Sequence, residues 1–312
     1  MVISIRDANG RTKNTVTAAG LIGGITAVSK SKNTLILQFT PAGELSILDV
    51  MAGKSIKENQ IQSIYNFSDD GLDGIAIRAD SNDLSKEHFD ECVTPLLEKD
   101  NMLDVLKPTK SENYRDVLSE EIFENIIKGA KSVYEYVYII LPRDEDDKKL
   151  VDMVMGYTDE DLVIVPQGPK QEVDLSNQKT NLVIINYEAS SKFDLHSMKK
   201  AYGVKKLYTI PYSVACRDAR ISETLLDFII LNRKDLKTDD NYSLFSSLNT
   251  LIERYVTNKD DDDEEEAKLE DQPQADVKVQ QSQDILPEDS VQEVIVRKGL
   301  FKKKEKKIMI NM

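Results

Sequence analysis

The stretch that decides the fold is residues 1–30, MVISIRDANGRTKNTVTAAGLIGGITAVSK. It reads as an apolar strand, a turn that contains Gly10 and a long helix, the order that places a phosphate at a helix N-terminus. Such a loop needs several glycines, a lysine for the phosphates and a Ser or Thr hydroxyl for Mg²⁺. The turn keeps only Gly10 and Lys13, and Asn14 stands where the hydroxyl belongs. We therefore expect that ATP hydrolysis is not the main activity of this protein.

Short apolar runs alternate with polar stretches of helical character along most of the chain. The runs that we interpret as strands are residues 2–5, 34–39, 102–106, 136–141, 162–165, 182–186 and 206–210. The expected helices are residues 14–29, 86–98, 119–131, 146–156 and 194–202, with further helical periodicity at 225–231 and 242–256. Nearly continuous apolar strands joined by crossover helices are typical of buried parallel sheets. The sequence thus predicts an α/β fold with a doubly wound, mostly parallel sheet.

Three glycines, Gly20, Gly23 and Gly24, lie inside the first expected helix. Each costs up to about 1 kcal/mol of helix stability relative to alanine. We expect that they permit close packing of this helix on the sheet.

The composition changes abruptly after residue 258. An acidic run, DDDDEEE at residues 260–266, leads into a Gln/Pro/Asp-rich stretch that ends at Pro287. Such a segment cannot bury enough apolar surface to offset its ordering entropy. We predict an α/β domain at residues 1–258, a disordered acidic linker at 259–290 and a basic, partly apolar tail at 291–312.

The basic tail has four open interpretations: attraction to anionic lipid headgroups, docking on a protein partner, folding back on the acidic linker, and a contribution to solubility alone. The side chains expected to make the first two contacts are Arg297, Lys298, Phe301, Lys302, Lys303 and Lys304.

The charge and cysteine content narrow the class of protein. A net charge of -14 and a pI near 4.8 make DNA an improbable partner, because non-specific DNA binding needs Lys and Arg to neutralise phosphates. Two cysteines, Cys92 and Cys216, are too few for a disulfide framework and are expected to be small buried side chains. No segment resembles a signal peptide or a membrane span. We expect a cytoplasmic protein.

Landmarks spread over residues 1–235 resemble the MinD/ParA family of deviant P-loop ATPases. The segment TLILQFTPAGELS, residues 34–46, is similar to the family's second strand and switch loop, with Pro41 and Gly43 in place, and YEYVYIILP at 134–142 is similar to a later strand. LVIIN at 182–186 resembles the strand whose final asparagine reads the adenine edge, and YTIPY at 208–212 resembles the loop beside the base. The resemblance implies that any residual nucleotide contacts are made by Gly10, Lys13, Asn14, Asn186 and Pro211.

Four positions depart from the family pattern. Ala8 replaces the signature lysine that contacts nucleotide across a dimer, Gln38 and Thr40 replace two aspartates, and Ile140 replaces the aspartate associated with Mg²⁺. Losing the aspartates at residues 38 and 140 removes the groups that orient water and magnesium, and phosphoryl transfer depends on positioning and electrostatics. The resemblance therefore implies a pseudo-ATPase without catalytic residues, a bound metal or a required cofactor, and ATP binding remains an alternative.

Residues 103–108, LDVLKP, and the expected helix 119–131 resemble most closely the pilus-assembly branch called TadZ or CpaE. The implied function is a scaffold that localises or assembles a cell-envelope machine, such as a Tad/Flp pilus or a related secretion system, through protein partners. The resemblance also implies a homodimer. One alternative is a switch that holds ATP without efficient hydrolysis; a DNA-partitioning ATPase is disfavoured by the net charge and the lost aspartates.

Other polar residues favour structural roles. His88 and His196 lack nearby ligand spacing for a metal or a catalytic partner. The acidic run at residues 144–147 either collects a cation or, as we favour, caps the next helix. Arg217, Asp218 and Arg220 either contact an anion or a dimer partner or, as we favour, form a salt-bridged helix start. Tyr134, Tyr136 and Tyr138 are interpreted as structural.

Overall fold

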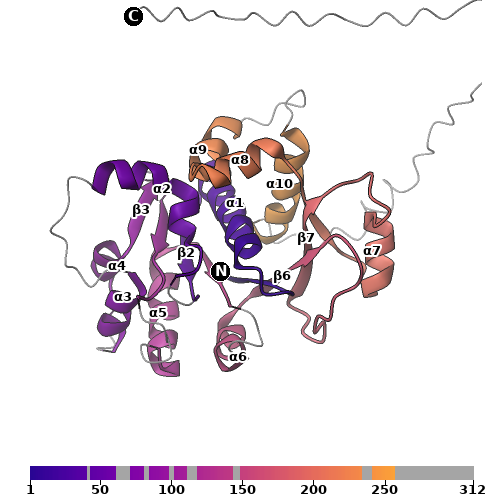
Figure 1. Ribbon diagram of the computed structural model, residues 1–312. Helices are drawn as coiled ribbons and strands as arrows, with labels where there is room; N and C mark the ends of the chain where they lie inside the picture. The colour runs from indigo at the N-terminus through magenta and orange to yellow at the C-terminus, as the bar shows by residue number, and fades with distance from the viewer. Residues whose placement is uncertain are drawn as a thin grey trace, which may run out of the picture. The chain divides into compact units, whose positions relative to one another are not determined.

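The structure, a computed structural model, describes residues 1–40, 43–60, 71–80, 84–97, 102–110, 118–142, 148–233 and 241–256, without the side chains of residues 55–60, 255 and 256. Within these residues eight strands form one sheet (Figure 1). The strands are β1 (Val2–Asp7), β2 (Thr34–Gln38), β3 (Thr94–Leu97), β4 (Leu103–Leu106), β5 (Tyr136–Ile140), β6 (Glu160–Pro166), β7 (Thr180–Tyr187) and β8 (Tyr208–Pro211). The predicted linker and tail, residues 259–312, and the acidic run at 144–147 lie outside the described residues.

The order of the strands is β3-β4-β2-β5-β1-β6-β7-β8, and every neighbouring pair is parallel except β3 with β4. The predicted doubly wound and mostly parallel sheet is therefore confirmed. The helices in the described part are α1 (Thr12–Lys30), α2 (Ile47–Gln60), α3 (Gly71–Ala79), α4 (Lys86–Cys92), α5 (Glu120–Val133), α6 (Lys148–Tyr157), α7 (Leu195–Tyr202), α8 (Val214–Ile221), α9 (Leu225–Asn232) and α10 (Tyr242–Val256).

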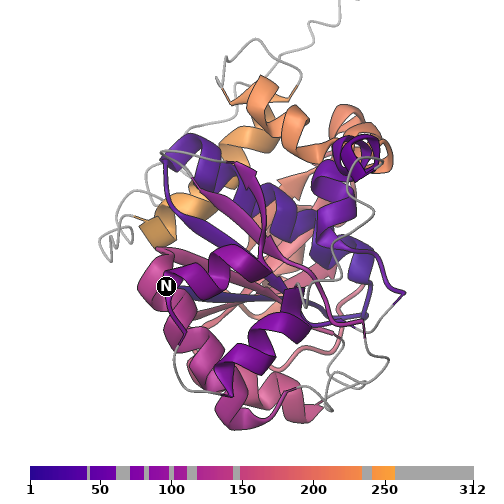
Figure 2. The same cartoon turned by 90° about the vertical axis from the view of Figure 1, so that its left-hand side faces the viewer.

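Helices cover both faces of the sheet because the central strands are apolar on both sides. Alternate residues of β2 point to opposite faces: Ile36 packs in the core beneath α1, whereas Leu35 and Leu37 pack beneath α3 and α5. Helices α2, α9 and α10 pack beside α1 on the first face, and α4 and α6 share the second (Figures 1 and 2). Helix α7 covers β6 and β7 on that second face.

One predicted helix is correct only in its first half. The helix expected at residues 86–98 ends at Cys92, and β3 begins at Thr94 and runs antiparallel to β4. Pro95 accounts for the difference, because proline has no amide to donate and forces the preceding residue into an extended conformation. An edge strand accommodates such a proline, which is the position that β3 has in the sheet.

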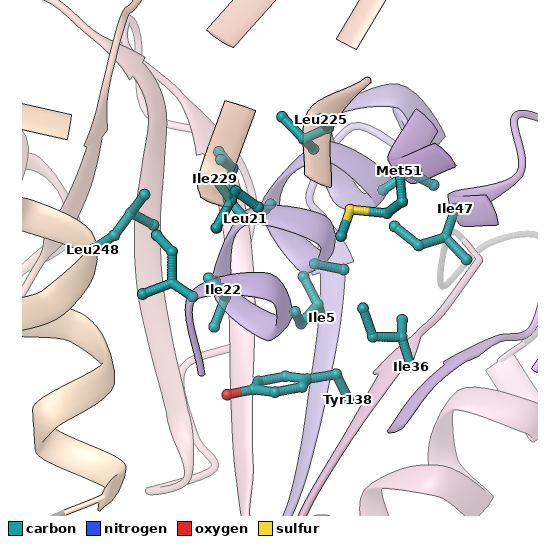
Figure 3. Packing of buried hydrophobic residues seen from close by; sticks show 14 of the residues in the cluster. Ile5, Leu21, Ile22, Ile36, Ile47, Met51, Tyr138, Leu225, Ile229 and Leu248 are labelled. Atoms are coloured by element: carbon teal, nitrogen blue, oxygen red, sulfur yellow. The ribbon is translucent and has the colours of Figure 1, made fainter. Parts of the chain in front are cut away.

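The glycines of α1 allow two kinds of close approach. A Cβ on Gly23 would lie 2.8 Å from Cδ1 of Ile36, so this residue packs on the sheet as expected. A Cβ on Gly20 would meet Met51 at 2.9 Å, and one on Gly24 would meet Ile229 at 2.6 Å. Those two glycines therefore face α2 and α9, and the expectation that all three serve helix-on-sheet packing is wrong. Figure 3 shows α1 lying between these helices and the sheet.

Replacing Gly23 with alanine should lower the free energy of unfolding by about 1–2 kcal/mol, because an extra carbon in a filled core costs more than the helix propensity returns. Urea unfolding measures this difference. Gly156→Ala in α6 is the control, since no atom lies within 4 Å of its added Cβ, and it should raise stability by up to about 1 kcal/mol. Equal effects at both positions would contradict the packing argument.

Candidate anion-binding pocket

The loop between β1 and α1 folds around a carboxylate that belongs to the chain itself. Oδ1 of Asp7 accepts hydrogen bonds from the amides of Asn9 at 2.7 Å and Arg11 at 3.2 Å, and Oδ2 accepts one from the side-chain amide of Asn14 at 3.0 Å. Gly10 takes a positive φ of 65° that closes the turn. Loop donors of the kind that hold a phosphate in related loops are thus already directed at a negative group. The amides of Thr12 and Lys13 donate no hydrogen bond in the described part of the chain.

Asp7 is not among the predicted site residues. An Asp whose side chain caps the backbone two residues later is a common turn signal, and Asp7 followed by Asn9 and Gly10 carries it.

A pocket of about 450 Å³ opens beside this loop, at the carboxyl ends of the strands. It is lined by residues of the α1 start, of the ends of β7 and β8, and of α8: Arg11, Lys13, Asn14, Thr17, Leu21, Ile185, Asn186, Ile210, Pro211, Tyr212, Ser213, Cys216, Arg217 and Arg220. Four of the five predicted contact residues therefore line one cavity, and Gly10 does not. The carboxyl edge is where parallel α/β sheets place their ligands.

Four lining side chains are basic and none is acidic. Arg217 pairs with Asp218 at 3.0 Å and donates to the hydroxyl of Tyr212 at 2.9 Å. Arg11, Lys13 and Arg220 have no carboxylate partner among the described residues. Burial lowers the pKa of the Arg220 guanidinium, and the neighbouring positive charge of Arg217 lowers this pKa further. The pocket thus holds positive charge that a bound anion would neutralise.

The expected salt-bridged start of a helix at Arg217 is observed at α8, where Asp218 is the partner. Arg220 differs, because its side chain faces the pocket instead of a carboxylate. The anion-contact alternative therefore applies best to Arg220.

Asn186 has an unusual backbone. Its φ is 56°, and the register of β7 against β8 shifts between Ile185 and Tyr187, so Asn186 forms a bulge. Asparagine tolerates this left-handed conformation better than most residues, and bulges redirect side chains beside functional sites. Its side-chain amide makes no hydrogen bond in the described part of the chain and is exposed. It is available to a ligand.

Two of the four positions that depart from the family pattern, Gln38 and Thr40, have structural roles. Nε2 of Gln38 donates to the hydroxyl of Thr40 at 2.7 Å and to the carbonyl of Leu45 at 2.8 Å, and its Oε1 accepts from the amide of Ile47 at 2.7 Å. Gln38 and Thr40 are both only 1% exposed. Together they fasten the end of β2 to the start of α2.

The other two departing positions, Ala8 and Ile140, have apolar side chains that cannot hold a metal or a phosphate. Ile140 is fully buried in the core under α1. The amide of Ala8 donates to the carbonyl of Ile164 at 2.9 Å, which joins the loop to β6.

Cys216 and the two histidines are poorly placed for nucleophilic catalysis or metal binding. Burial raises the pKa of the Cys216 thiol to about 11, so the thiol is neutral at pH 7 and unreactive. His88 sits in the capping box of α4 with Ser85, and His196 is exposed on α7. The described part of the chain contains no group of three His, Cys, Asp or Glu side chains that could hold a metal ion. No helix in it is long and apolar enough to cross a membrane.

A mostly parallel sheet with a loop and helix after its central strand, and a basic pocket at the carboxyl edge, define a P-loop-type α/β fold. The chain is similar to a ParA family ATPase from Chlorobium tepidum TLS, with a TM-score of 0.60 and 14% identity over 80% of this chain and 98% of that one. MinD in the MinC:MinD cell division complex of Aquifex aeolicus gives a TM-score of 0.55 and 13% identity, over 82% and 96% of the two chains. The cell division ATPase MinD of Pyrococcus furiosus gives 0.50 and 16%, over 81% and 98%.

These likenesses show that the chain has the ParA/MinD fold. No protein-family profile and no curated protein sequence matches it.

Proposed function

We propose that this protein is a catalytically degenerate member of the ParA/MinD fold that acts as a cytoplasmic scaffold through protein–protein binding. The observation that carries the proposal is the hydrogen bonding of Gln38, whose amide is committed to Thr40, Leu45 and Ile47. As the resemblance has it, active relatives carry aspartates at the positions of Gln38 and Thr40, and the aspartates at the positions of Gln38 and Ile140 orient water and magnesium. Here Gln38 and Thr40 are buried and support the loop before α2, so they have no group to offer the reaction.

The loop around Asp7 supports a scaffold whose shape does not depend on nucleotide. Because the Asp7 carboxylate accepts from two backbone amides and from Asn14, it acts inside the chain as a bound anion would. The start of α1 is thereby ordered before any ligand arrives. This arrangement favours a scaffold whose binding surface is always present over one whose surface forms only when nucleotide binds.

The machine that we propose for this scaffold is a Tad/Flp pilus or a related secretion apparatus, from the resemblance of residues 103–108 to the TadZ/CpaE branch. MinD of Aquifex aeolicus was solved in complex with MinC, a protein partner. On this chain, Val214 and Ile221 of α8 are 53% and 64% exposed and Leu231 of α9 is 81% exposed, which supplies apolar side chains for such a contact or for a homodimer. The basic tail supplies a second contact, with a partner or the inner face of the membrane.

A second candidate function is a switch that holds ATP without efficient hydrolysis. The specific observation in its favour is the pocket itself, which brings Lys13, Asn186 and Pro211 together with three arginines. Such a switch would bind ATP, as the family does, but would not hydrolyse it efficiently.

Phosphate release tests the proposal. The purified full chain, incubated with ATP and Mg²⁺, should release inorganic phosphate no faster than a protein-free blank, and Lys13→Ala should not change the rate. An active ParA or MinD ATPase assayed in parallel shows that turnover is detectable. Release that exceeds the blank and disappears in Lys13→Ala would refute the pseudo-ATPase.

The identity of the machine has a separate test, which is to identify the genes that neighbour the gene for this protein. A secretion ATPase and pilin genes alongside are expected. A gene for a centromere-binding protein would favour partitioning and count against the pilus.

A further inference from the structure

We propose that the basic pocket binds a nucleoside polyphosphate in its metal-free form, with Arg220 and its basic neighbours taking the place of magnesium. This inference rests on the second candidate function, in which the pocket holds nucleotide. It assigns a ligand contact to α8. It also explains two features together: the chain lacks the magnesium ligands of the family pattern, and arginines supply positive charge in their place.

Magnesium does not fit the residues present. The positions where the family resemblance places its environment hold Asn14, Gln38, Thr40 and Ile140, and none of them supplies a carboxylate oxygen. The side-chain amide of Asn14 donates to Asp7, and Oε1 of Gln38 accepts from Ile47. Mg²⁺ demands octahedral oxygen ligands and is usually held through one or two carboxylates. Two described carboxylates belong to this region, and both are engaged: Asp7 accepts three hydrogen bonds from its own loop, and Glu44 accepts one from the hydroxyl of Thr12.

The positive charge of the pocket replaces the missing cation. A metal-free nucleoside triphosphate is a polyanion whose charge Mg²⁺ normally reduces, and here Arg11, Lys13, Arg217 and Arg220 line one cavity without an acidic side chain among them. Guanidinium groups bind phosphate oxygens through paired hydrogen bonds, which an ammonium cannot do. The pocket is thus built to neutralise such a ligand directly.

Arg220 is the residue on which this binding depends most. Its guanidinium is partly buried and has no carboxylate partner in the described part of the chain, whereas Arg217 is already engaged by Asp218 and Tyr212. A partly buried cation without a counter-ion is costly, and a bound phosphate removes that cost. Arg220 therefore gains more from the ligand than Arg217 does.

The loop around Asp7 explains why side chains, and not loop amides, must hold the phosphates. The amides of Asn9 and Arg11 already donate to Asp7, so they are not free to approach an anion. Only the amides of Thr12 and Lys13 are uncommitted within the described residues at this helix start. Binding should accordingly depend on arginine charge to an unusual degree.

Isothermal titration of the full chain with ATP, once in Mg²⁺ and once in EDTA, tests the proposal. We expect ATP to bind more tightly in EDTA than in excess Mg²⁺, because Mg²⁺ converts most of the ATP into its metal complex and so lowers the concentration of the form that the pocket binds. Arg220→Gln should weaken binding about tenfold, since a hydrogen bond to a charged group is worth roughly 1.5 kcal/mol or more. Arg220→Lys should recover part of that loss, and Lys206→Gln, an exposed lysine before β8, should change nothing.

The thermal unfolding midpoint of each variant shows whether it is folded, and Arg220→Lys keeps the test valid if Arg220→Gln is not. Binding in EDTA that is no tighter than binding in Mg²⁺ would overturn the metal-free site and leave the ATP-holding switch standing. Wild-type affinity in Arg220→Gln would overturn the role of Arg220. No ATP binding in either buffer would overturn both the site and the switch, while the scaffold, which is tested by phosphate release, would stand.

Discussion

Replacing Gln38 with aspartate should lower the free energy of unfolding by about 3 kcal/mol or more and should not produce ATP hydrolysis. Aspartate restores the residue type that the family resemblance places here, but it is shorter and cannot donate a hydrogen bond when ionised. The carbonyl of Leu45 and the amide of Ile47 would lose their partner in a site that is 1% exposed. A charge would also be buried there. Chemical denaturation and the phosphate-release assay measure the two parts of this prediction.

Gln167 provides a matched control for this substitution. Its side chain makes the same number of hydrogen bonds, donating to the carbonyls of Glu188 and Phe193 at 2.9 and 2.8 Å and accepting from the amide of Glu188 at 2.9 Å. Because Gln167 is only half-buried, water can replace these partners, and Gln167→Asp should cost about 1 kcal/mol or less. If Gln38→Asp cost no more than the control, Gln38 would not be the structural fastening that we describe.

The second part of the Gln38 prediction depends on Ile140 and Ala8. An aspartate at residue 38 alone would still lack the groups that the resemblance places at those two positions. Since phosphoryl transfer needs its charges in place together, one restored carboxylate should leave the rate at the blank. Measurable turnover in Gln38→Asp would mean that the remaining departures matter less than the proposed function requires.

Replacing Asp161 with asparagine should lower the free energy of unfolding by about 3–5 kcal/mol, because it breaks a buried ion pair and leaves a buried positive charge beside a neutral amide. Nη2 of Arg6 lies 2.9 Å from Oδ2 of Asp161, and the two side chains are 11% and 0% exposed. The hydroxyls of Ser4 and Thr180 donate to the same carboxylate at 2.8 and 3.2 Å. This cluster joins β1, β6 and β7, and chemical denaturation measures its contribution.

Glu124→Gln removes an exposed ion pair with Lys128 and is the control for Asp161→Asn. The Lys128 side chain is 68% exposed, so solvent screens this pair, and its loss should leave the free energy of unfolding nearly unchanged. Pairing Arg6→Met with Asp161→Leu should recover much of the loss, since an apolar pair removes both buried charges. A small effect of Asp161→Asn would show that the charge is not buried as described.

The sequence predicted the parallel sheet and the place of the pocket. Apolar runs such as residues 34–39 and 182–186 predict buried strands, and their carboxyl ends must meet at one edge of a parallel sheet. Lys13, Asn186 and Pro211, each beside such an end, therefore line one cavity although they are far apart in the chain. The helix predicted at residues 86–98 ends early, because Pro95 disrupts the helical pattern and lies in the edge strand β3.

The alternation of strands and helices along the chain, the mostly parallel sheet and the loss of acidic groups at residues 38, 40 and 140 were determined by the sequence alone, because periodicity and residue identity are local properties. Only the tertiary structure decided that Gln38 is tied to the start of α2, that Asp7 fills its own loop and that Arg220 has no carboxylate partner among the described residues. The physical reason is that hydrogen bonding and desolvation depend on which side chains from distant segments come within a few ångströms, and no spacing along the chain specifies that.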